Sequence, residues 1–540
     1  MSTIDLSLTR IRSLTAHLPP YTRPTIHIAG TNGKGSVSAL LTGILNAFRV
    51  GRFNSPHLVH IYDCISINNS PVSLATYTTS RRQVENADTT HGTHLSSFEL
   101  LTLTALRVFE DAAVDIVILE VGMGGLLDAT NVIPTSSVLC SALTAVDLDH
   151  QAFLGTTVSQ IARHKAGIAR PGRPFVLGPQ NDSSIQQVVE EVVLHAGGIL
   201  LRSLRAHADD GSPSTVSALP PPPQRICATL ESYPDRPIHA SLPLQGDHQL
   251  DNLSTALGII DALLLLSSKP ISESLTNANP DLIELIETLN LPSRLTPDTI
   301  ERGIGNVQWP GRLSFHLLQI PIHPVDNPTA STSIPLLILA DGAHNSASAH
   351  TLGAYMSRLQ STTPAAGPPT TYILALSHSP PKTPHDTLAP ILASMVSSSS
   401  SSSSSLNSES SPPNLKPGIA LLPFTPPAGM PWVRHVDPRV LRETVVQLFS
   451  SMPPLEGGAS LDITNKVEIR IFDNDTSVVN TSELTEGYNR PLVDALRWAA
   501  ARHQVTDNPQ SPRGLVVLAG SLYLVADLYR LLEGGFGSES

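Results

Sequence analysis

The segment "TIHIAGTNGKGSVSALLTGIL", residues 25–45, constrains the fold more than any other part of the sequence. A β-rich run leads into glycines at 30, 33 and 35, and a helix-forming stretch follows at once. Glycine lets the backbone approach a bound group closely, and a helix N-terminus directs its free N–H groups toward the same place. The segment therefore predicts a strand, a binding loop and a helix, which together begin an α/β fold.

The loop departs from the common phosphate-binding pattern, G-x-x-x-x-G-K-[ST]. Only two residues separate Gly30 from Gly33, and Gly35 lies between Lys34 and Ser36. The chemistry that a phosphate needs is still present, because Lys34 supplies a positive charge and Ser36 a hydroxyl for a magnesium ion. A glycine-rich turn with an exposed lysine would have the same sequence, so this segment alone leaves both interpretations open.

Short apolar runs alternate with helical stretches in two series along the chain. "TIHIAG" and "VDIVILEVG" belong to the first series, and the second contains "PLLILADGAHN", "TYILALSH", "GIALLPF", "VEIRIFDN" and "RGLVVLAGS". Strands that alternate with helices form mainly parallel sheets, so we expect an α/β protein of two domains, residues 1–312 and 313–540. Three segments rich in proline or serine are predicted to be disordered insertions: 205–224, 361–369 and 397–416.

The composition limits the partners and the location of the protein. The net charge of -12 argues against nucleic acid or an anionic membrane as a partner. The chain has only three cysteines, without metal-type spacing, and no apolar run that we judge long enough to span a bilayer. We interpret residues 1–20 as an amphipathic helix of the fold rather than a cleaved signal. These features predict a cytoplasmic location and leave a mitochondrial pool open.

Three residues outside the loop are candidates for the same site. Glu120 ends an apolar strand, where nucleotide sites often hold a metal-binding carboxylate. His150 follows a further apolar strand in "DLDHQAFLG", and Lys165 lies in the helical stretch "IARHKAGI". Each also has a simpler interpretation, namely a solvated strand end, a structural histidine and a surface lysine.

A set of motifs occurs in order along nearly the whole chain: "GTNGKGS", "SPHLVHIYDCISIN", "FELLTLTAL", "LEVGMGGLLDATNVI", "DHQAFLGTTVSQIARHKAGI", "LPLQGDHQLDN", "WPGR", "DGAHN" and "GSLYLVADL". Together they resemble the folate branch of the Mur ligase superfamily, which contains folylpolyglutamate synthases and dihydrofolate synthases. The shortened loop is the form that this superfamily uses for ATP. The resemblance implies an N-terminal P-loop-type ATPase domain with a mainly parallel sheet and a C-terminal, Rossmann-like glutamate-ligase domain.

The resemblance also implies a nucleotide site and a metal site. The residues that match ATP contacts of the family are Gly33, Lys34, Gly35, Ser36, Asn252, Arg312 and Asp341. Those that match metal ligands are Ser36, Glu120, His150 and Lys165, the last as a carbamylated lysine. Carbamylation turns a cation into an anion, which explains a lysine beside a metal. The implied cofactors are ATP and two magnesium ions, and a monovalent cation is left open.

The family's reaction is implied as well. ATP phosphorylates a carboxylate, and the amine of L-glutamate attacks the resulting acyl phosphate. Lys34, Lys165 and His344 match residues with catalytic roles, and His344, Ser521 and Tyr523 fall where the family holds glutamate. The expected partners are therefore small molecules, namely a pterin acid, L-glutamate and ATP, and we expect a monomer.

The acceptor is either dihydropteroate or a reduced folate. The segment "IYDCISIN" stands where polyglutamate synthases usually carry a basic pair, as in "RERI". "GMPWVRHVDP" and "IDLSLTRI" also resemble the fungal dihydrofolate synthase type, so we favour dihydropteroate over tetrahydrofolate, with a bifunctional enzyme as a further alternative. Rival interpretations are a cell-wall amino-acid ligase, against which "SPHL" with "DGAHN" argues, and a nucleotide-binding regulator without ligase activity.

Overall fold

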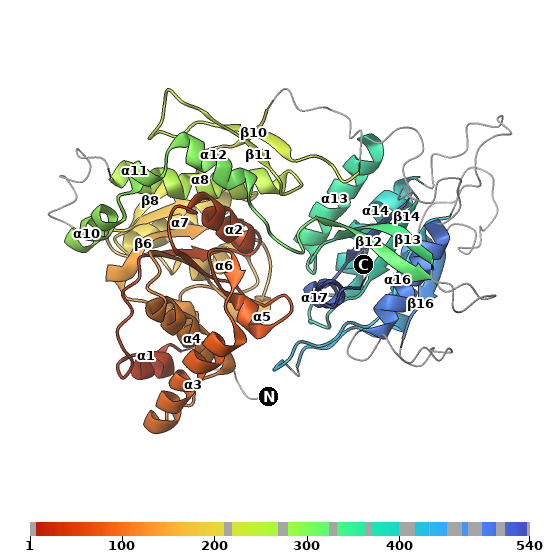
Figure 1. The fold of residues 1–540 in the computed structure, drawn as a ribbon, viewed down its shortest axis with the longest axis horizontal. Coiled ribbons are helices and arrows are strands. Elements are labelled where there is room, and N and C mark those ends of the chain that lie inside the picture. The colour runs from red at the N-terminus through yellow and green to blue at the C-terminus, as the bar shows by residue number, and fades with distance from the viewer. Residues whose placement is uncertain are drawn as a thin grey trace. The chain divides into compact units, whose positions relative to one another are not determined.

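The chain forms two units, which are described separately. The computed structural model describes residues 7–209, 219–267, 279–322, 332–362, 369–398, 416–430, 432–450, 467–473, 489–503 and 514–536 (Figure 1). Unit 1 comprises Met1–Ser212 and Pro223–Trp309, and unit 2 comprises Pro213–Pro222 and Pro310–Ser540. The main division therefore lies between Trp309 and Pro310, just before the division after Arg312 that the sequence suggested.

Unit 1 is built on an eight-stranded sheet with the order β4-β3-β2-β5-β1-β6-β7-β8. Its strands are β1 (Thr25–Ala29), β2 (Val50–Phe53), β3 (Ile65–Ile67), β4 (Ser70–Pro71), β5 (Ile116–Glu120), β6 (Val138–Leu143), β7 (Pro174–Leu177) and β8 (Ile199–Arg202). Neighbouring strands in the series β2-β5-β1-β6-β7-β8 are parallel. At one edge β3 pairs antiparallel with both β2 and β4. Every residue of β1 and β5 is buried, which explains their continuous apolar sequences.

Helices cover both faces of this sheet. The helices of unit 1 are α1 (Thr9–Thr15), α2 (Lys34–Ile44), α3 (Leu74–His91), α4 (Ser97–Asp111), α5 (Gln151–Leu154), α6 (Val158–Ala166), α7 (Ser183–His195), α8 (His248–Leu266), α10 (Pro280–Leu289), α11 (Leu291–Arg294) and α12 (Pro297–Gly305). Three short 3₁₀ turns are η1 (Ile61–Cys64), η2 (Ala129–Val132) and η3 (Thr135–Ser137). Helices α2, α8 and α10 to α12 share a core on one face, while α1, α3, α4, α6 and α7 pack on the other.

A second, three-stranded antiparallel sheet completes unit 1. It has the order β11-β10-β9, with β9 (His207–Ala208), β10 (Gln224–Ala228) and β11 (Ile238–Leu242). Its apolar side chains, including Ile226 and Ile238, join the core beneath α8. The prediction of a disordered insertion over 205–224 is thus wrong at residues 207–208, whose backbone pairs with β10, and at Gln224, which is the first residue of β10.

Helix α8 corrects a second expectation. Among the described residues it is the one helix that is long and apolar enough to cross a membrane by length and composition. The sequence interpretation, which found no such run, was wrong on this point. In the structure 83% of the apolar stretch of this helix is buried. Helix α8 is a core helix, because it packs on α2, β6 and β7.

Unit 2 is a six-stranded sheet with the order β12-β13-β17-β14-β15-β16. Its strands are β12 (Ser314–Ile322), β13 (Thr332–Ala340), β14 (Thr370–Leu374), β15 (Gly418–Leu421), β16 (Glu468–Ile471) and β17 (Leu515–Ala519). All pairs are parallel except β12 with β13. Helices α13 (Ser346–Thr362), α14 (Pro384–Ser398) and α15 (Pro438–Ser450) share one core. Helix α16 (Arg490–His503) contacts β12 and β13, and α17 (Leu522–Glu533) contacts β17.

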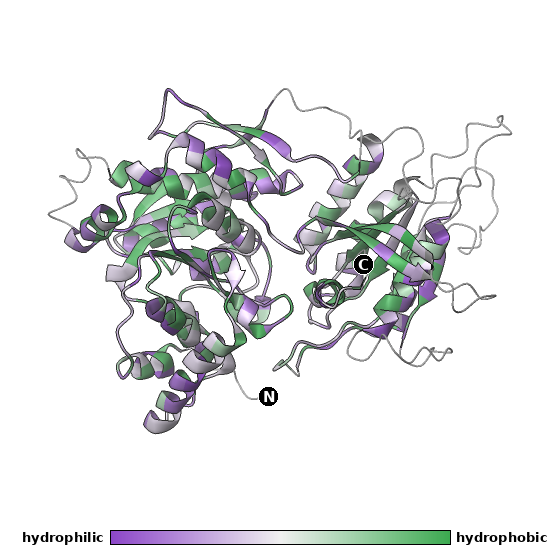
Figure 2. Ribbon diagram, viewed as in Figure 1, coloured by the Kyte–Doolittle hydropathy of each residue, from purple (hydrophilic) through white to green (hydrophobic). Residues whose placement is uncertain are grey.

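The predicted fold class is confirmed, since both units are α/β and mainly parallel. The central strands of each unit are largely hydrophobic in Figure 2, as the continuous apolar runs of the sequence indicated. Most of the three predicted insertions lies outside the described residues, at 210–218, 363–368 and 399–415.

Buried His503 should make the stability of unit 2 depend on pH. Its Nε2 lies 3.0 Å from Thr371 Oγ1, its Nδ1 has no hydrogen-bond partner among the described residues, and burial lowers its pKa to about 4. Because the folded-state pKa lies below the unfolded value, this contribution to stability is complete above pH 6.5 and is lost as the pH falls toward 4. The loss is at most about 3 kcal/mol.

The test compares thermal unfolding midpoints at pH 7 and pH 5 for the natural protein and His503→Gln. The difference between the two pH values should shrink in the variant, since glutamine does not titrate. An equal difference in both proteins would show that His503 does not contribute.

Candidate active site

The candidate residues of unit 1 gather at the carboxyl ends of three neighbouring strands. β1 lies between β5 and β6, with Ile28 opposite Glu120 and Ala29 opposite Leu143. The chain after β1 is the glycine loop, and Glu120 is the last residue of β5. Parallel sheets bind ligands at this edge, where the connections on the two sides of β1 diverge. The fold therefore places the loop and Glu120 side by side.

The folded loop leaves no space for side chains at two of its glycines. Gly30 and Gly33 have φ angles of +149° and +91°, in the region that favours glycine. A Cβ on Gly30 would lie 1.8 Å from Thr144 Oγ1, and one on Gly33 would lie 2.1 Å from Asn252 Oδ1. α2 begins directly after Gly33, so its first N–H groups lack acceptors within the helix. These groups are available for phosphate oxygens, and Asn252 of α8 does border the loop as the resemblance implied.

Lys34 is held against the loop rather than extended into solvent. Its Nζ donates to the carbonyls of Gly30 (3.1 Å) and Thr31 (3.2 Å) and lies 3.8 Å from Glu120 Oε1. Asn54 Nδ2 donates to the other Glu120 oxygen at 2.5 Å. Glu120 is buried, so the interpretation as a solvated strand end is wrong. Sequence reasoning missed Asn54, although its place directly after β2 puts it at the same edge of the sheet.

Ser36 and Glu120 fit a magnesium ion. Both are buried, and both offer the oxygen ligands that Mg²⁺ prefers. No three His, Cys, Asp or Glu side chains of the described ranges form a ready-made metal cluster. Mg²⁺ at a nucleotide usually takes one or two protein ligands and completes its shell with phosphate oxygens and water, so two oxygen donors suffice.

Lys165 is not a surface lysine. It projects from α6, is buried, and its Nζ donates to the carbonyl of Gly30 at 2.8 Å. Burial lowers the pKa of Lys165 to about 7, assisted by the charge of Lys34, while Asp149 and Asp128 act in the opposite direction. A large share of this amine is therefore uncharged near neutral pH.

His150 lies on the segment that follows β6. Its backbone is left-handed (φ +50°), and its Nε2 lies 3.7 Å from Asp149 Oδ2. The side chain of His150 is 46% exposed, unlike the buried Lys165. Asp149 influences both residues, since it also affects the pKa of Lys165. A role for His150 as a metal ligand stays a prediction.

In unit 2 the candidate residues follow β13 and β17, which are neighbours in the sheet, except for Arg312, which lies just before β12. Asp341 Oδ2 accepts from the backbone N–H of Leu313, and its Oδ1 accepts from that of Ala343, each at 2.9 Å. Burial raises the pKa of Asp341. The carboxylate thus joins the segment after Pro310 to the segment after β13. Its contact with ATP stays a prediction, because the structure shows a positioning role.

Arg312 and His344 lie on the two segments that Asp341 joins. Arg312 Nη1 donates to the carbonyl of Gly311 at 2.9 Å, and His344 Nδ1 lies 2.9 Å from the carbonyl oxygen of Gly342. A Cβ on Gly342 would lie 2.6 Å from Arg312 Nη1, so the two segments are in contact. The arrangement brings Arg312 of "WPGR", an expected ATP contact, close to the "DGAHN" segment that carries Asp341 and His344, and the roles of these residues stay predictions.

Ser521 and Tyr523 begin α17 at the same edge of unit 2. Ser521 is buried, its Oγ caps the helix by accepting from the N–H of Tyr523, and it lies 3.2 Å from Ser377 Oγ. Tyr523 packs against Phe424 with ring centroids 5.2 Å apart. These contacts explain why the two residues are held in place, and their contact with glutamate stays a prediction. Ser377, which follows β14, was missed by sequence reasoning.

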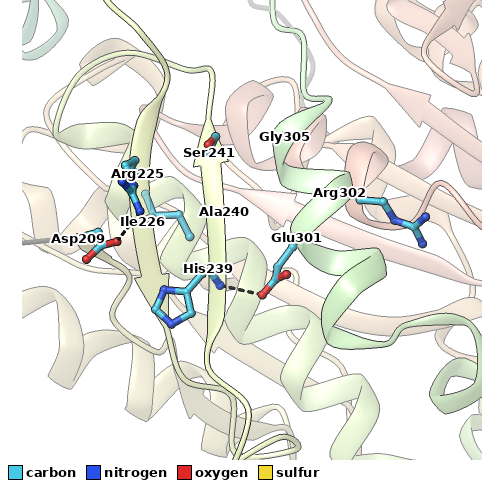
Figure 3. A pocket seen from close by; sticks show the side chains of 9 residues that line it. All are labelled: Asp209, Arg225, Ile226, His239, Ala240, Ser241, Glu301, Arg302 and Gly305. Carbon is cyan, nitrogen blue, oxygen red and sulfur yellow. Dashed lines mark hydrogen bonds and ion pairs between the residues drawn. The ribbon is translucent and has the colours of Figure 1, made fainter. Parts of the chain in front are cut away.

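A separate pocket of about 350 Å³ lies on the small sheet of unit 1. Figure 3 shows its lining on β10, β11 and α12, with Arg225 facing Asp209 and the backbone of His239 bonded to Glu301. None of the residues that the sequence singled out lines it. Arg225 pairs with Asp209 and Glu301 pairs with Arg236, so we do not assign the activity to this pocket.

Comparison with known proteins agrees with this geometry. Residues 28–260 match the model of the Mur ligase middle domain. The chain is 30% identical to the dihydrofolate synthetase of Saccharomyces cerevisiae over 538 residues, covering 98% of both chains. It is 28% identical to a probable dihydrofolate synthetase of Schizosaccharomyces pombe over 539 residues, covering 98% of this chain and 99% of the relative.

Solved structures show the same fold. The folylpolyglutamate synthase of Mycobacterium tuberculosis, complexed with ADP and AMPPCP, has a TM-score of 0.65 and 23% identity, covering 99% of this chain and 96% of that one. A bifunctional folylpolyglutamate synthase/dihydrofolate synthase from Yersinia pestis, complexed with AMPPNP and a manganese ion, has a TM-score of 0.61 and 22% identity, covering 98% and 95%. With the glycine loop, its two lysines and a relative that is 30% identical over 98% of both chains in agreement, the chain belongs to the folate branch of the Mur ligase family.

Proposed function

We propose that this protein is an ATP-dependent ligase that joins L-glutamate to the carboxylate of a pterin acid. The favoured reaction converts 7,8-dihydropteroate, L-glutamate and ATP into 7,8-dihydrofolate, ADP and phosphate. The full-length similarity to two fungal dihydrofolate synthetases supports this choice over a tetrahydrofolate polyglutamate synthase, which remains the alternative.

One observation carries the proposal. The carbonyl of Gly30 accepts from two amines, that of the partly buried Lys34 at 3.1 Å and that of the buried Lys165 at 2.8 Å, and Glu120 Oε1 lies 3.8 Å from Lys34 Nζ. A nucleotide-binding regulator needs the loop and one lysine. A second buried lysine with a pKa near 7 has no use in a simple nucleotide switch, but it fits a site that must handle a second anionic group.

The reaction requires little covalent work from the protein. A carboxylate oxygen of the pterin acid attacks the γ-phosphorus of ATP, the bond to the β-phosphate oxygen breaks, and ADP leaves. The amine of glutamate then attacks the acyl carbon of the acyl phosphate, loses a proton, and inorganic phosphate departs. Lys34 and the N–H groups at the start of α2 offset the charge of the transferring group, as preorganised donors do in phosphoryl transfer.

Magnesium would be held by Ser36 and Glu120, where it neutralises triphosphate charge. A second ion would use His150 and a carbamate on Lys165. Carbamylation needs the uncharged amine, which attacks CO₂ to give a carbamate and a proton. Burial supplies that form of Lys165 at neutral pH, because it lowers the pKa to about 7. Two metal sites and a monovalent cation are thus part of the proposal.

Exposed apolar side chains near this site suit a planar acceptor. Leu126 and Leu127 follow β5, Leu148 and Phe153 follow β6, and each is 44–47% exposed. The two segments are in contact, since a Cβ on Gly124 would lie 2.9 Å from Leu154. Large exposed apolar groups on adjacent loops favour an aromatic ligand over a purely ionic one.

The segment after "SPHLVH" supports an acceptor without a glutamate tail. In η1 the carboxylate of Asp63 accepts from the backbone N–H groups of Val59 and His60, and Cys64 is buried in the core. No lysine or arginine stands in this turn, so it presents no cation for the extra carboxylate of a polyglutamate chain. The cytoplasmic location and the monomeric state expected from the sequence stay predictions.

Replacement of Lys34 tests the phosphate loop. Lys34→Ala should leave the thermal midpoint nearly unchanged and lower kcat/KM about a hundredfold, since it removes a preorganised cation from the transferring phosphate. Lys416→Ala is the control and should be active, because Lys416 precedes β15 at the amino ends of the strands, opposite the candidate site. Near-normal turnover of Lys34→Ala would contradict the loop assignment.

Replacement of Lys165 tests carbamylation. With ¹³C-bicarbonate at neutral pH, the natural protein should give a carbamate signal in the NMR spectrum that Lys165→Ala lacks. Lys165→Ala should also slow acyl phosphate formation while still binding ADP, and a small carboxylic acid should restore part of the rate. Wild-type rates for Lys165→Ala at limiting magnesium would remove this lysine from the mechanism.

A substrate panel separates the two acceptors. Dihydropteroate and tetrahydrofolate monoglutamate are each supplied with ATP, magnesium and glutamate, and ADP release is measured. We expect kcat/KM to be at least about tenfold higher with dihydropteroate, because η1 offers no partner for a glutamyl carboxylate. A preference for tetrahydrofolate would establish the alternative, and ADP release without any acceptor would argue against a ligase.

A further inference from the structure

Trp309, the last residue of unit 1, packs against the phosphate loop. A Cβ on Gly35 would lie 2.4 Å from Cζ2 of Trp309, 3.0 Å from its Cε2 and 3.2 Å from its Nε1. The edge of the indole therefore occupies the space that a side chain at position 35 would need. Gly35 lies between Lys34 and Ser36, so any displacement of this ring acts directly on the first turn of α2.

Arg52 holds the ring from β2. Its guanidinium carbon lies 5.1 Å from the centroid of the Trp309 ring, within the range of a cation–π interaction. Arg52 is 9% exposed, and burial lowers its pKa to about 10, so it is charged at neutral pH. Among the described residues it forms no ion pair, and its Nε has no hydrogen-bond partner. The indole face is thus a main contact of a buried charge.

The other contact of Arg52 fixes its direction. Arg52 Nη1 donates to Asn69 Oδ1 at 3.0 Å. Asn68 and Asn69 form the left-handed turn between β3 and β4, and Asn68 Oδ1 accepts from the backbone N–H of Val50 at 2.9 Å. A series of contacts therefore runs from this turn through Arg52 and Trp309 to Gly35.

We propose that Trp309 and Arg52 are positioning residues for the phosphate loop, and that nucleotide in the loop changes the surroundings of the Trp309 ring. The inference rests on the proposed ATP site. The chain passes from Trp309 through Pro310 to Arg312, so the residue that touches the loop also begins the segment that leads to the next expected triphosphate contact.

Tryptophan fluorescence tests the contact directly. The chain has three tryptophans, of which Trp432 is 65% exposed. Titration with ADP and magnesium should change the emission of the natural protein in a saturable way. Trp309→Phe should abolish this change, and the control Trp432→Phe should retain it. A response that persists in Trp309→Phe, or a natural protein that binds ADP with no response, would overturn the inference.

Steady-state kinetics test the positioning role. Arg52→Gln should raise KM for ATP about tenfold and leave KM for glutamate within about twofold, because only the loop is displaced. Arg52→Lys keeps the charge and should restore most of the loss. Arg294→Gln is a matched control, since it removes an arginine 4.2 Å from the Phe48 ring in the same unit and should leave KM for ATP unchanged.

Calorimetric titration with ADP separates this inference from the proposed function. If the natural protein does not bind ADP, the ATP site itself is wrong. If it binds ADP and Arg52→Gln, Arg52→Lys and Trp309→Phe bind it equally well, the site stands and the positioning role is refuted. If Arg52→Gln fails to fold, the ADP affinity of Trp309→Phe compared with that of the natural protein still tests the positioning role.

Discussion

Three glycines with no room for a side chain determine the shape of the nucleotide loop. A Cβ would lie 1.8 Å from Thr144 at Gly30, 2.1 Å from Asn252 at Gly33 and 2.4 Å from Trp309 at Gly35. The three neighbours come from the end of β6, from α8 and from the end of unit 1. The loop is therefore enclosed by parts of the chain that are far apart in sequence, so its geometry depends on the whole unit being folded.

Three basic side chains lie around this loop, and Glu120, Asp128 and Asp149 are the acidic groups that act on them. Lys34 Nζ lies 3.8 Å from Glu120 Oε1. The charge of Lys34 lowers the pKa of Lys165, and the charge of Glu120 acts to raise the pKa of the buried Arg52. Burying charges without partners costs several kcal/mol per ion. Anionic phosphates bound in the loop would offset part of this cost, so these residues favour a phosphate ligand.

The central strands β1 and β5 of unit 1 and the glycine loop could be predicted because each depends on local sequence. Continuous apolar runs gave β5 and β17, and glycines with a lysine gave the loop. The edge strand β12, the small sheet and the burial of α8 could not be read from one segment, since they arise from pairing and packing over long distances. Asn54, Arg52 and Trp309 were missed for the same reason, because their partners lie on other elements.

Lys165 shows why a lysine can be suited to a site that already contains Lys34. A fully charged second ammonium this deep in the unit would repel both Lys34 and a metal ion. Burial resolves the conflict by lowering the pKa of Lys165 to about 7, whereas the carbonyl of Gly30 keeps the nitrogen in place in either protonation state of the amine. The uncharged amine is the form that the proposed reaction with CO₂ requires, and the carbamate would carry a negative charge near the cation of Lys34. Burial thus supplies the uncharged amine that the proposed carbamylation needs, and the charge of Lys34 would offset that of the carbamate.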